Sequence, residues 1–183
     1  GAGDYLNGLE AITIAVWIQS ANAGVDNGFL TTEEPEGWGG GLMMRYASSG
    51  PYANETEAGP TTDVIQIKIP TTEGVVGYET TENSHTTDWQ HVAITWQRGQ
   101  LPKVYIDGFQ DTPTFNGIEG LGIVDGAVSY GEIAGIQQLI IGKGAADTSG
   151  SWNGLVDDLR IYDRVLDPAE IAVADRDLRA DTD

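Results

Sequence analysis

Cysteine, basic residues and long apolar runs are all scarce in this sequence of 183 residues. Cysteine is absent, which excludes disulfide bonds and thiolate metal sites. Only 9 residues are Lys or Arg against 28 Asp or Glu, so the formal net charge is −19. Because nucleic-acid affinity comes mainly from Lys and Arg contacts with phosphate, we expect no nucleic-acid partner and no anionic membrane surface. No apolar run approaches the roughly 18 residues of a membrane span, so we expect no membrane insertion.

The sequence is rich in glycine and in short apolar segments. Its 25 Gly and 7 Pro are spread along the chain, which predicts many turns and therefore many short strands. The expected strands cover residues 11–18, 41–46, 64–69, 75–80, 88–97, 103–108, 137–144 and the apolar part of 151–162. Many short strands with one helix at the end predict an all-β, antiparallel two-sheet sandwich over residues 1–183 as a single domain.

Only one helix is expected, near the C-terminus. Asp167 offers an N-cap, Pro168 occupies the first helical position, and Glu170 stands three residues after the cap. The segment 11–18, "AITIAVWI", is apolar on both alternations, as in a strand that is buried on two faces. In 88–97, "DWQHVAITWQ", one alternation carries valine, isoleucine and tryptophan, and the other carries histidine, alanine and threonine.

The last expected strand, within "SWNGLVDDLRIYDRVLDPAEIA", raises a question about Asp157. Leucine and isoleucine occupy alternate positions along 155–161, and Asp157 falls on the same alternation, which predicts an inward carboxylate. Burying an unpaired charge is costly, so this carboxylate needs a cation, backbone amides, or an ion pair with Arg160 or Arg164. Asp158 is expected to face outward beside Arg160.

Three segments resemble the laminin-G-like, concanavalin-A-like jelly rolls. They are "GAGDYLNGLEAITIAVWIQS" at the start, "DWQHVAITWQRGQLPKVYIDG" at 88–108, and "WNGLVDDLRIYDRVLDPAEI" at 152–171. The resemblance implies a jelly-roll sandwich. Members of this group usually begin with another strand that pairs near the C-terminal one. We therefore expect the domain to lack this first strand, or to receive it from a neighbouring subunit by strand donation.

The resemblance also implies a structural calcium ion. In many of these sandwiches a calcium ion joins the early Asp-Tyr segment to the first Asp of the closing strand, which here implies Asp4 and Asp157 as side-chain ligands. Calcium accepts six to eight oxygen ligands in irregular geometry, and it would account for an inward Asp157. The other partners for Asp157, which are backbone amides or an ion pair with Arg160 or Arg164, stay open at this point.

Catalysis is not expected. The Glu-x-Asp-x-x-Glu signature of the glucanases that share this fold does not occur, and neither does a Gly-x-Ser-x-Gly elbow. The "GWGGG" stretch at 37–41 lacks the lysine of a phosphate-binding loop. The sequence has only two histidines, His85 and His91, and no cysteine. Because zinc in proteins is usually bound by three or four histidine or cysteine side chains, we do not expect a zinc site.

Aromatic side chains in loops are the expected ligand contacts, because a sugar ring stacks on a flat aromatic face. Trp38 precedes a strand in a Gly-rich loop, and Tyr52 and Tyr130 also lie in expected loops. The tryptophans in or beside the strands, Trp89 among them, are expected in the core.

The sequence as a whole predicts a non-catalytic recognition domain of an extracellular or cell-surface bacterial protein, stabilised by calcium and binding carbohydrate. This fold also carries adhesion modules, so fold alone does not decide the function. The alternative is a structural, assembly or adhesion module of a surface filament or large adhesin, which contacts other protein subunits.

Overall fold

The computed structural model describes residues 4–24, 27–32, 41–50, 61–112, 114–115, 118–119, 128–143 and 151–179. Two of the predicted ligand contacts, Trp38 and Tyr52, lie outside these ranges. Among the residues so described, no helix is long and apolar enough to cross a membrane.

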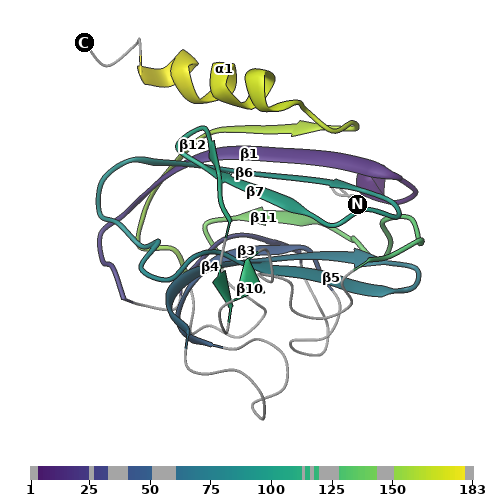
Figure 1. Ribbon diagram of the computed structural model, residues 1–183, viewed down its shortest axis with the longest axis horizontal. Helices are drawn as coiled ribbons and strands as arrows, with labels where there is room; N and C mark the ends of the chain where they lie inside the picture. Colours follow the sequence, from purple (N-terminus) through teal and green to yellow (C-terminus); the bar gives the residue numbers. More distant parts are fainter. Residues whose placement is uncertain are drawn as a thin grey trace.

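Two antiparallel five-stranded sheets form the body of the molecule, one above the other in Figure 1. Sheet A has the order β12 (Gly154–Tyr162), β1 (Ala11–Ser20), β6 (Gln90–Gln97), β7 (Lys103–Ile106), β8 (Phe109–Gln110). Sheet B has the order β11 (Leu139–Ile141), β2 (Asn27–Thr32), β3 (Met43–Gly50), β4 (Thr61–Thr71), β5 (Gly74–Glu79). A short 3-10 helix, η1 (Asp4–Leu6), precedes β1, and a two-stranded ribbon joins β9 (Thr114–Phe115) to β10 (Ile118–Glu119). The predicted antiparallel jelly-roll sandwich is confirmed.

The main core fills the space between the two sheets. The alternate residues Val92, Ile94 and Trp96 of β6 all point into it, as their spacing predicts. β1 contributes Ile12 and Ile14 from one alternation. The other alternation of β1 is buried too, so the prediction of a strand that is buried on two faces is confirmed.

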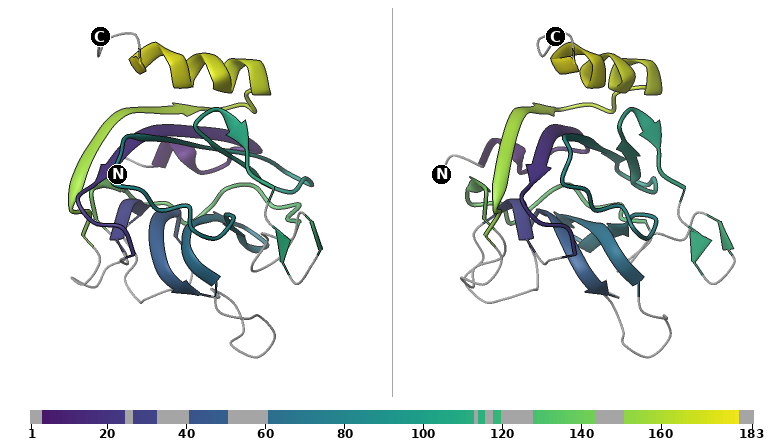
Figure 2. Two further views of the ribbon diagram at one scale, coloured as in Figure 1. Left: turned by 60° about the vertical axis from the view of Figure 1, so that its left-hand side comes forward. Right: turned by 90° about the vertical axis from the view of Figure 1, so that its left-hand side faces the viewer.

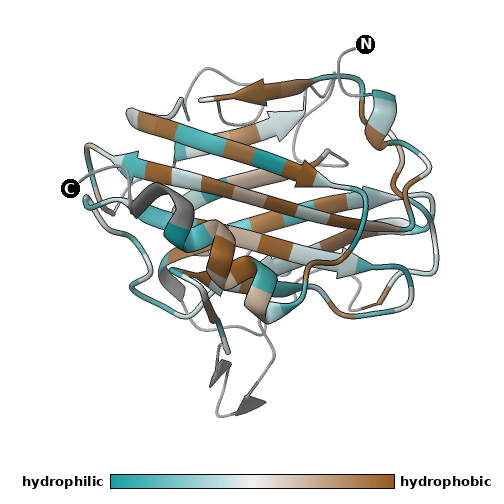
Figure 3. Cartoon of the chain, turned by 90° about the horizontal axis from the view of Figure 1, so that it is seen from above, coloured by the Kyte–Doolittle hydropathy of each residue, from teal (hydrophilic) through white to brown (hydrophobic). Residues whose placement is uncertain are grey.

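The helix α1 (Pro168–Arg179) covers the outward face of sheet A, as both views of Figure 2 show. Ile171 and Leu166 pack there against Ala15, Ala93 and Tyr105. Because alanine is small, the helix can approach the sheet closely. In Figure 3 the strands are seen from the helix side, and apolar and polar residues alternate along them.

A capping box begins α1 where the sequence predicts one. The Asp167 carboxylate accepts hydrogen bonds from the N–H groups of Ala169 and Glu170 at 2.8 and 2.9 Å. The Glu170 carboxylate in turn accepts the Asp167 N–H at 2.9 Å. Both predictions for this helix start, the cap and the residue three positions later, are confirmed.

The chain before α1 is held by a buried threonine of β1. The Thr13 hydroxyl donates to the Arg164 carbonyl at 2.7 Å and accepts the Leu166 N–H at 2.9 Å. One side chain therefore satisfies two backbone groups that would otherwise be buried beside the helix without partners.

A β-bulge in β12 changes the direction in which Asp157 points. Asp157 is paired with Trp17, and the next register pair places Arg160 opposite Ala15, so two residues of β12 face one of β1. Asp158, inside the bulge, has a φ of 46°. An extra residue shifts the alternation by one position, so Val156 packs toward the core and Asp157 is exposed. The prediction of an inward Asp157 carboxylate is wrong.

Candidate functional site

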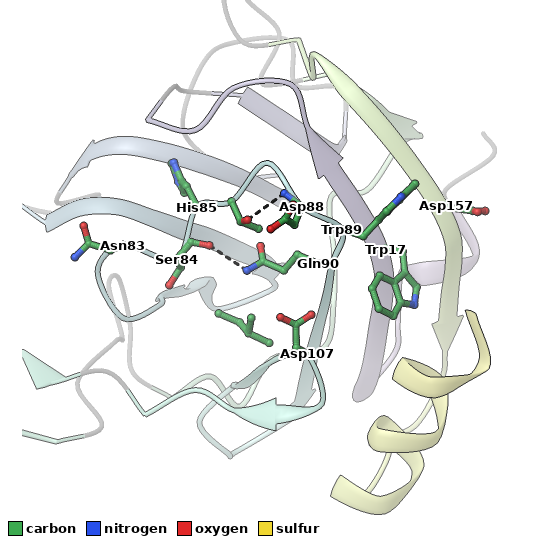
Figure 4. A pocket seen from close by; sticks show the side chains of 11 residues that line it. Trp17, Asn83, Ser84, His85, Asp88, Trp89, Gln90, Asp107 and Asp157 are labelled. Carbon is green, nitrogen blue, oxygen red and sulfur yellow. Dashed lines mark hydrogen bonds between the residues drawn. The ribbon is translucent and has the colours of Figure 1, made fainter. Parts of the chain in front are cut away.

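A cleft of about 760 Å³ lies at the end of the sandwich where β6 begins. Cavities that bind small molecules typically measure about 300–1,000 Å³. The lining comes from β1, the β5–β6 loop, the β7–β8 turn and β12 (Figure 4). The lining residues are Trp17, residues 83–86, residues 88–90, Ile106, Asp107 and Asp157.

Gln90 and Tyr46 hold the loop that forms one wall of the cleft. The buried Gln90 amide donates to the Ser84 carbonyl at 3.1 Å, and its oxygen accepts the Tyr46 hydroxyl at 2.9 Å. The Tyr46 oxygen also accepts the Thr86 N–H at 3.3 Å. The pKa of Tyr46 is raised to about 12, mainly by burial; the backbone contact with Thr86 partly offsets this rise, and the negative charge of Asp107 adds to it. The loop is therefore anchored to the core at its base.

His85 is a wall residue whose hydrogen bonds identify its tautomer. Its ring stacks on Tyr46, with centroids 3.9 Å apart and an interplanar angle of 9°. Nδ1 accepts the Gly24 N–H at 3.2 Å, so the proton of the neutral ring is on Nε2, which lies 2.8 Å from the Val64 carbonyl oxygen. Both ring nitrogens are thus engaged with backbone, which fixes the orientation of the ring in the wall of the cleft.

The tight turn between β7 and β8 places Asp107 at the cleft. Asp107 and Gly108 have φ values of 51° and 79°, the left-handed pair that a two-residue hairpin of type I′ needs. An Asp-Gly pair is typical of this turn type, because both residues adopt positive φ readily. The Asp107 carboxylate accepts the His91 N–H at 3.0 Å, and its own N–H donates to the His91 carbonyl at 2.8 Å. The position of this carboxylate is therefore set by backbone on both sides.

Trp89 gives the cleft its exposed aromatic surface. Its exposed fraction is 40%, whereas Trp17, which packs against His91 with ring centroids 5.3 Å apart, is only 5% exposed. The prediction that Trp89 belongs to the core is wrong. The sequence did contain the signal, because Trp89 shares its alternation with His91 and Ala93 on the outward face, not with the core residues of β6.

Carboxylates and amides surround this aromatic surface. Figure 4 shows the side chains of Asp88 and Asp107 on either side of Gln90, while Asp157 points away from the other side chains. The Asp88 N–H is fixed to the Thr86 hydroxyl at 3.1 Å. The cleft therefore offers hydrogen-bond acceptors next to an apolar ring, an arrangement suited to a ligand with many hydroxyl groups.

Tyr130, the third predicted ligand contact, lies at the opposite end of the sandwich. It is 63% exposed, and its N–H donates to the Glu73 carboxylate at 3.1 Å. Ser129, next to it, accepts the Gly99 N–H at its carbonyl, which ties this segment to the β6–β7 turn. Tyr130 does not line the cleft at the start of β6.

Asp4 and Asp157 do not share a site in the described structure. Asp4 belongs to η1, which lies near the start of β1 in Figure 1, whereas Asp157 is opposite Trp17 toward the other end of that strand. Both are exposed, and Asp157 accepts the Asp158 N–H at 2.8 Å, so it caps a backbone amide. Among the residues that the structure describes, no group of three or more His, Cys, Asp or Glu could hold a metal ion. This geometry does not fit one calcium bound by both residues.

The two arginines considered as partners of Asp157 are paired elsewhere. Arg160 forms an ion pair with Asp158 at 2.7 Å, as expected for those two residues. Arg164 holds Glu170 at 2.7 Å in a two-bonded contact. The pKa of the exposed Glu170 carboxyl is lowered to about 2, mainly by this contact with Arg164 and to a smaller extent by the hydrogen bond from the Asp167 N–H.

The two facing antiparallel sheets, with a polar cleft that contains a tryptophan at one end, define a lectin-like jelly-roll domain. The family model that matches residues 2–172 is that of the concanavalin A-like lectin/glucanases superfamily. The chain belongs to this family. No curated protein sequence matches it significantly.

Solved structures with a similar fold have low sequence identity to the chain. Domain 4 of AbnA, a GH43 extracellular arabinanase from Geobacillus stearothermophilus solved with arabinotriose, is 17% identical with a TM-score of 0.52. That match covers 91% of this chain and 66% of the other, just under two thirds. The CBM40 of the Ruminococcus gnavus IT-sialidase, bound to α2,3 sialyllactose, is 15% identical with a TM-score of 0.55, covering 91% and 83%. The SAP-like pentraxin of Limulus polyphemus is 14% identical with a TM-score of 0.58, covering 91% and 70%. At these identities the likeness concerns the fold.

Proposed function

We propose that the chain is a non-catalytic carbohydrate-binding domain and that its ligand lies in the cleft at the start of β6. The observation that carries this proposal is Trp89, which is 40% exposed inside a cleft lined with polar side chains. An indole ring left exposed in a concave site can pack against the C–H face of a sugar. The carboxylates of Asp88 and Asp107 can then accept hydrogen bonds from its hydroxyl groups.

The structural neighbours support a glycan as the ligand class. The AbnA domain was solved with arabinotriose and the CBM40 with sialyllactose, so domains of this fold bind glycans in both cases. Although each of these two belongs to an enzyme, the matched part is domain 4 in one and a carbohydrate-binding module in the other. The absence of the glucanase signature from this sequence agrees with binding without catalysis.

The proposal includes an extracellular or cell-surface setting. The support is that the arabinanase, whose domain 4 has a similar fold, is an extracellular enzyme. The structural calcium ion predicted from the resemblance is not part of the proposed binding mechanism, since Asp4, the other predicted ligand, is not among the residues that line the cleft.

A glycan array tests the proposal directly. The purified wild-type domain, the Trp89→Ala variant and the Tyr130→Ala variant are applied to the same array of neutral and charged glycans. Removing a central aromatic contact typically costs about 2 kcal/mol or more, so we expect Trp89→Ala to bind at least about thirtyfold more weakly. Tyr130→Ala is the matched control, because Tyr130 is exposed but lies at the other end of the sandwich.

Two results would overturn the proposal. One is a blank array with a domain shown to be folded by circular dichroism and a cooperative melt. The other is glycan binding that survives Trp89→Ala unchanged, since that would place the ligand elsewhere.

A further inference from the structure

We infer that the cleft binds an oligosaccharide chain and not a single sugar, with Trp89 packed against one unit and the side-chain amide of Asn83 hydrogen-bonded to another. This inference rests on the proposed function and concerns the same site. It adds a second contact point to the cleft, and it predicts that the affinity depends on the length of the glycan.

The lining of the cleft is long enough to separate these two contacts. In Figure 4, Asn83 and Trp89 lie on opposite sides of Gln90. The Gln90 amide donates to the Ser84 carbonyl at 3.1 Å, so a whole glutamine side chain and a hydrogen bond separate the start of β6 from the loop that carries Asn83. The cleft volume of about 760 Å³ is in the upper part of the range for ligand cavities. A sugar ring stacked on Trp89 therefore leaves room for a second unit at Asn83.

Asn83 gives this end of the cleft a polar group that the fold does not use. The residue is exposed and lines the cleft. Within the part of the chain that the structure describes, no hydrogen bond joins its amide to another residue. A side-chain amide carries both a donor and an acceptor, so it can bond a sugar hydroxyl in either direction.

The loop fixes the position of Asn83 from both sides. On one side, the Thr81 hydroxyl donates to the Asp111 carboxylate at 2.7 Å. On the other, the Ser84 N–H donates to the Asp63 carbonyl at 2.8 Å, and the Ser84 hydroxyl donates to the Thr81 carbonyl across the turn. Asn83 itself has a φ of 62°, in the left-handed region that asparagine and glycine adopt most readily. A contact group on a loop that is already ordered costs less conformational entropy when a ligand binds.

The left-handed turn alone can account for an asparagine at this position, and glycine separates the two explanations. Glycine adopts a φ of 62° without strain but has no amide. If Asn83 only forms the turn, Asn83→Gly leaves glycan affinity unchanged at every chain length. If Asn83 contacts the ligand, the variant stays folded and loses affinity for long glycans only, because a single sugar on Trp89 does not reach residue 83.

The expected size of the effect follows from the loss of one hydrogen bond. A neutral hydrogen bond corresponds to a factor of about two to ten in an equilibrium constant. We therefore expect Asn83→Gly to weaken the binding of a long oligosaccharide by about two- to tenfold. The wild type should bind that oligosaccharide at least about tenfold more tightly than the monosaccharide, since the additional unit contributes both a hydrogen bond and buried surface.

Isothermal titration with glycans of increasing length provides the test. The probes are arabinose, xylose, glucose and galactose series, each from the monosaccharide to the hexasaccharide, and the series that binds on the array is the one titrated. Affinity that rises with length in the wild type, and that Asn83→Gly lowers for the long members only, supports the inference.

Three results would overturn it. Equal affinity for the monosaccharide and the longer members removes the second unit, and an unchanged affinity of Asn83→Gly for the long members removes Asn83 as its contact. Both results leave the proposed function intact if Trp89→Ala abolishes binding. A blank array with a folded domain overturns the proposed function and the inference together.

A neighbouring residue of the same turn supplies the matched control. Glu82 is exposed and is not among the lining residues, so Glu82→Gln should bind every member of the series as the wild type does. An equal loss of affinity in this control would assign the effect to the loop as a whole and show the inference to be wrong. Urea denaturation checks that each variant is folded. If Asn83→Gly is unstable, Asn83→Asp keeps a residue that tolerates the left-handed turn and removes the amide donor, and it should likewise alter the affinity for long members only.

Discussion

The two ends of the sandwich both expose an aromatic side chain, and the cleft described above lies at the end that carries Trp89. At the cleft end, Trp89 is 40% exposed beside Asp88 and Asp107. At the other end, which we call the Tyr130 end and define as residues 71–74, 98–102 and 128–133, the aromatic residue is more exposed, at 63%. Exposure alone would therefore choose the end opposite the cleft.

The difference lies in how the loops are tied together. At the Tyr130 end, the hydroxyls of Thr71 and Ser129 are 2.6 Å apart and the Thr72 N–H donates to the Glu132 carbonyl. The Tyr130 ring also lies over Gly99, only 3.2 Å from where a β-carbon on that glycine would stand. These contacts join the loops of the two sheets. At the cleft end the loop is anchored at its base by Gln90, and the polar side chains above it remain accessible.

The largest effect on stability is expected at the Tyr130 end. In Gly131→Ala, the new β-carbon would lie 2.5 Å from the Thr72 hydroxyl oxygen and 2.9 Å from the Glu73 nitrogen. Overpacking of this kind typically costs 1–3 kcal/mol, and we expect about 3 kcal/mol because a backbone atom is involved. Chemical denaturation measures the change. Gln100→Ala, an exposed substitution at the same end, should change the free energy of unfolding by less than about 0.5 kcal/mol. Equal stability of the two variants would show that this end is looser than the contacts indicate.

A substitution at the base of the cleft should affect stability and binding together. Gln90→Ala removes the hydrogen bonds to the Ser84 carbonyl and the Tyr46 hydroxyl, and it leaves both groups without these partners in a largely buried place. We expect a loss of about 2 kcal/mol in the free energy of unfolding and a severalfold weaker glycan affinity. Isothermal titration with a neutral hit from the array, together with urea denaturation, measures both. Binding that stays unchanged would mean that the loop does not need this anchor.

The predicted calcium ion is tested by melting the domain in about 1 mM calcium and in excess chelator. Extracellular calcium sites often bind at roughly 10⁻⁴–10⁻³ M, so bound calcium would add about 1 kcal/mol. If Asp157 is a ligand, the melting temperature of the wild type responds to the chelator and that of Asp157→Ala does not. An equal response of the two proteins removes Asp157 from the ligand set, and no response in either removes the calcium site.

The smallest effect is expected away from both ends, at the start of α1. The pKa of Glu170 is lowered to about 2 in the folded chain, below its ordinary value near 4.5. A lowered pKa means that the contacts of Glu170 stabilise the fold above pH 4.5, and that this contribution is lost as the pH falls toward 2. Glu170→Gln should flatten the acid side of the stability curve slightly, because the pair with Arg164 is exposed. Glycan binding at neutral pH should be the same in both proteins, and a change in it would link α1 to the cleft.

Much of the fold could be read from local patterns. The two faces of β6, the capping box at Asp167 and the turn at Asp107 follow from residues near each other in sequence. Each of these features depends on strand alternation, on side chains that bond to adjacent backbone, or on a residue pair that favours left-handed φ.

The failures share a physical cause in the pairing register. β2 was not predicted, and its Phe29 and Leu30 are adjacent yet both buried, because a register irregularity between Gly28 and Leu30 interrupts the alternation. The wrong direction for Asp157 has the same origin in the β12 bulge. A bulge depends on the partner strand, which lies far away in sequence, so a one-strand pattern does not reveal it.

The candidate site was only partly accessible to prediction. The sequence predicts aromatic contacts in loops, whereas Trp89 lies at the start of a strand, where an aromatic side chain is typical of the core. The cleft itself combines segments from β1, β6, β7 and β12, and no single segment of the sequence shows that they converge.

The bulge in β12 also affects how the molecule can associate with other chains. β12 is an edge strand of sheet A, and a straight edge offers a regular row of backbone groups to an incoming strand. Here the row is interrupted by the left-handed Asp158, and charged side chains at residues 157, 158 and 160 follow one another along the edge. Such an edge discourages the addition of a strand from another molecule, whether in ordered assembly or in aggregation. Deleting one residue of the bulge would restore a regular edge on β12, and we expect such a variant to self-associate by strand pairing more readily than the wild type.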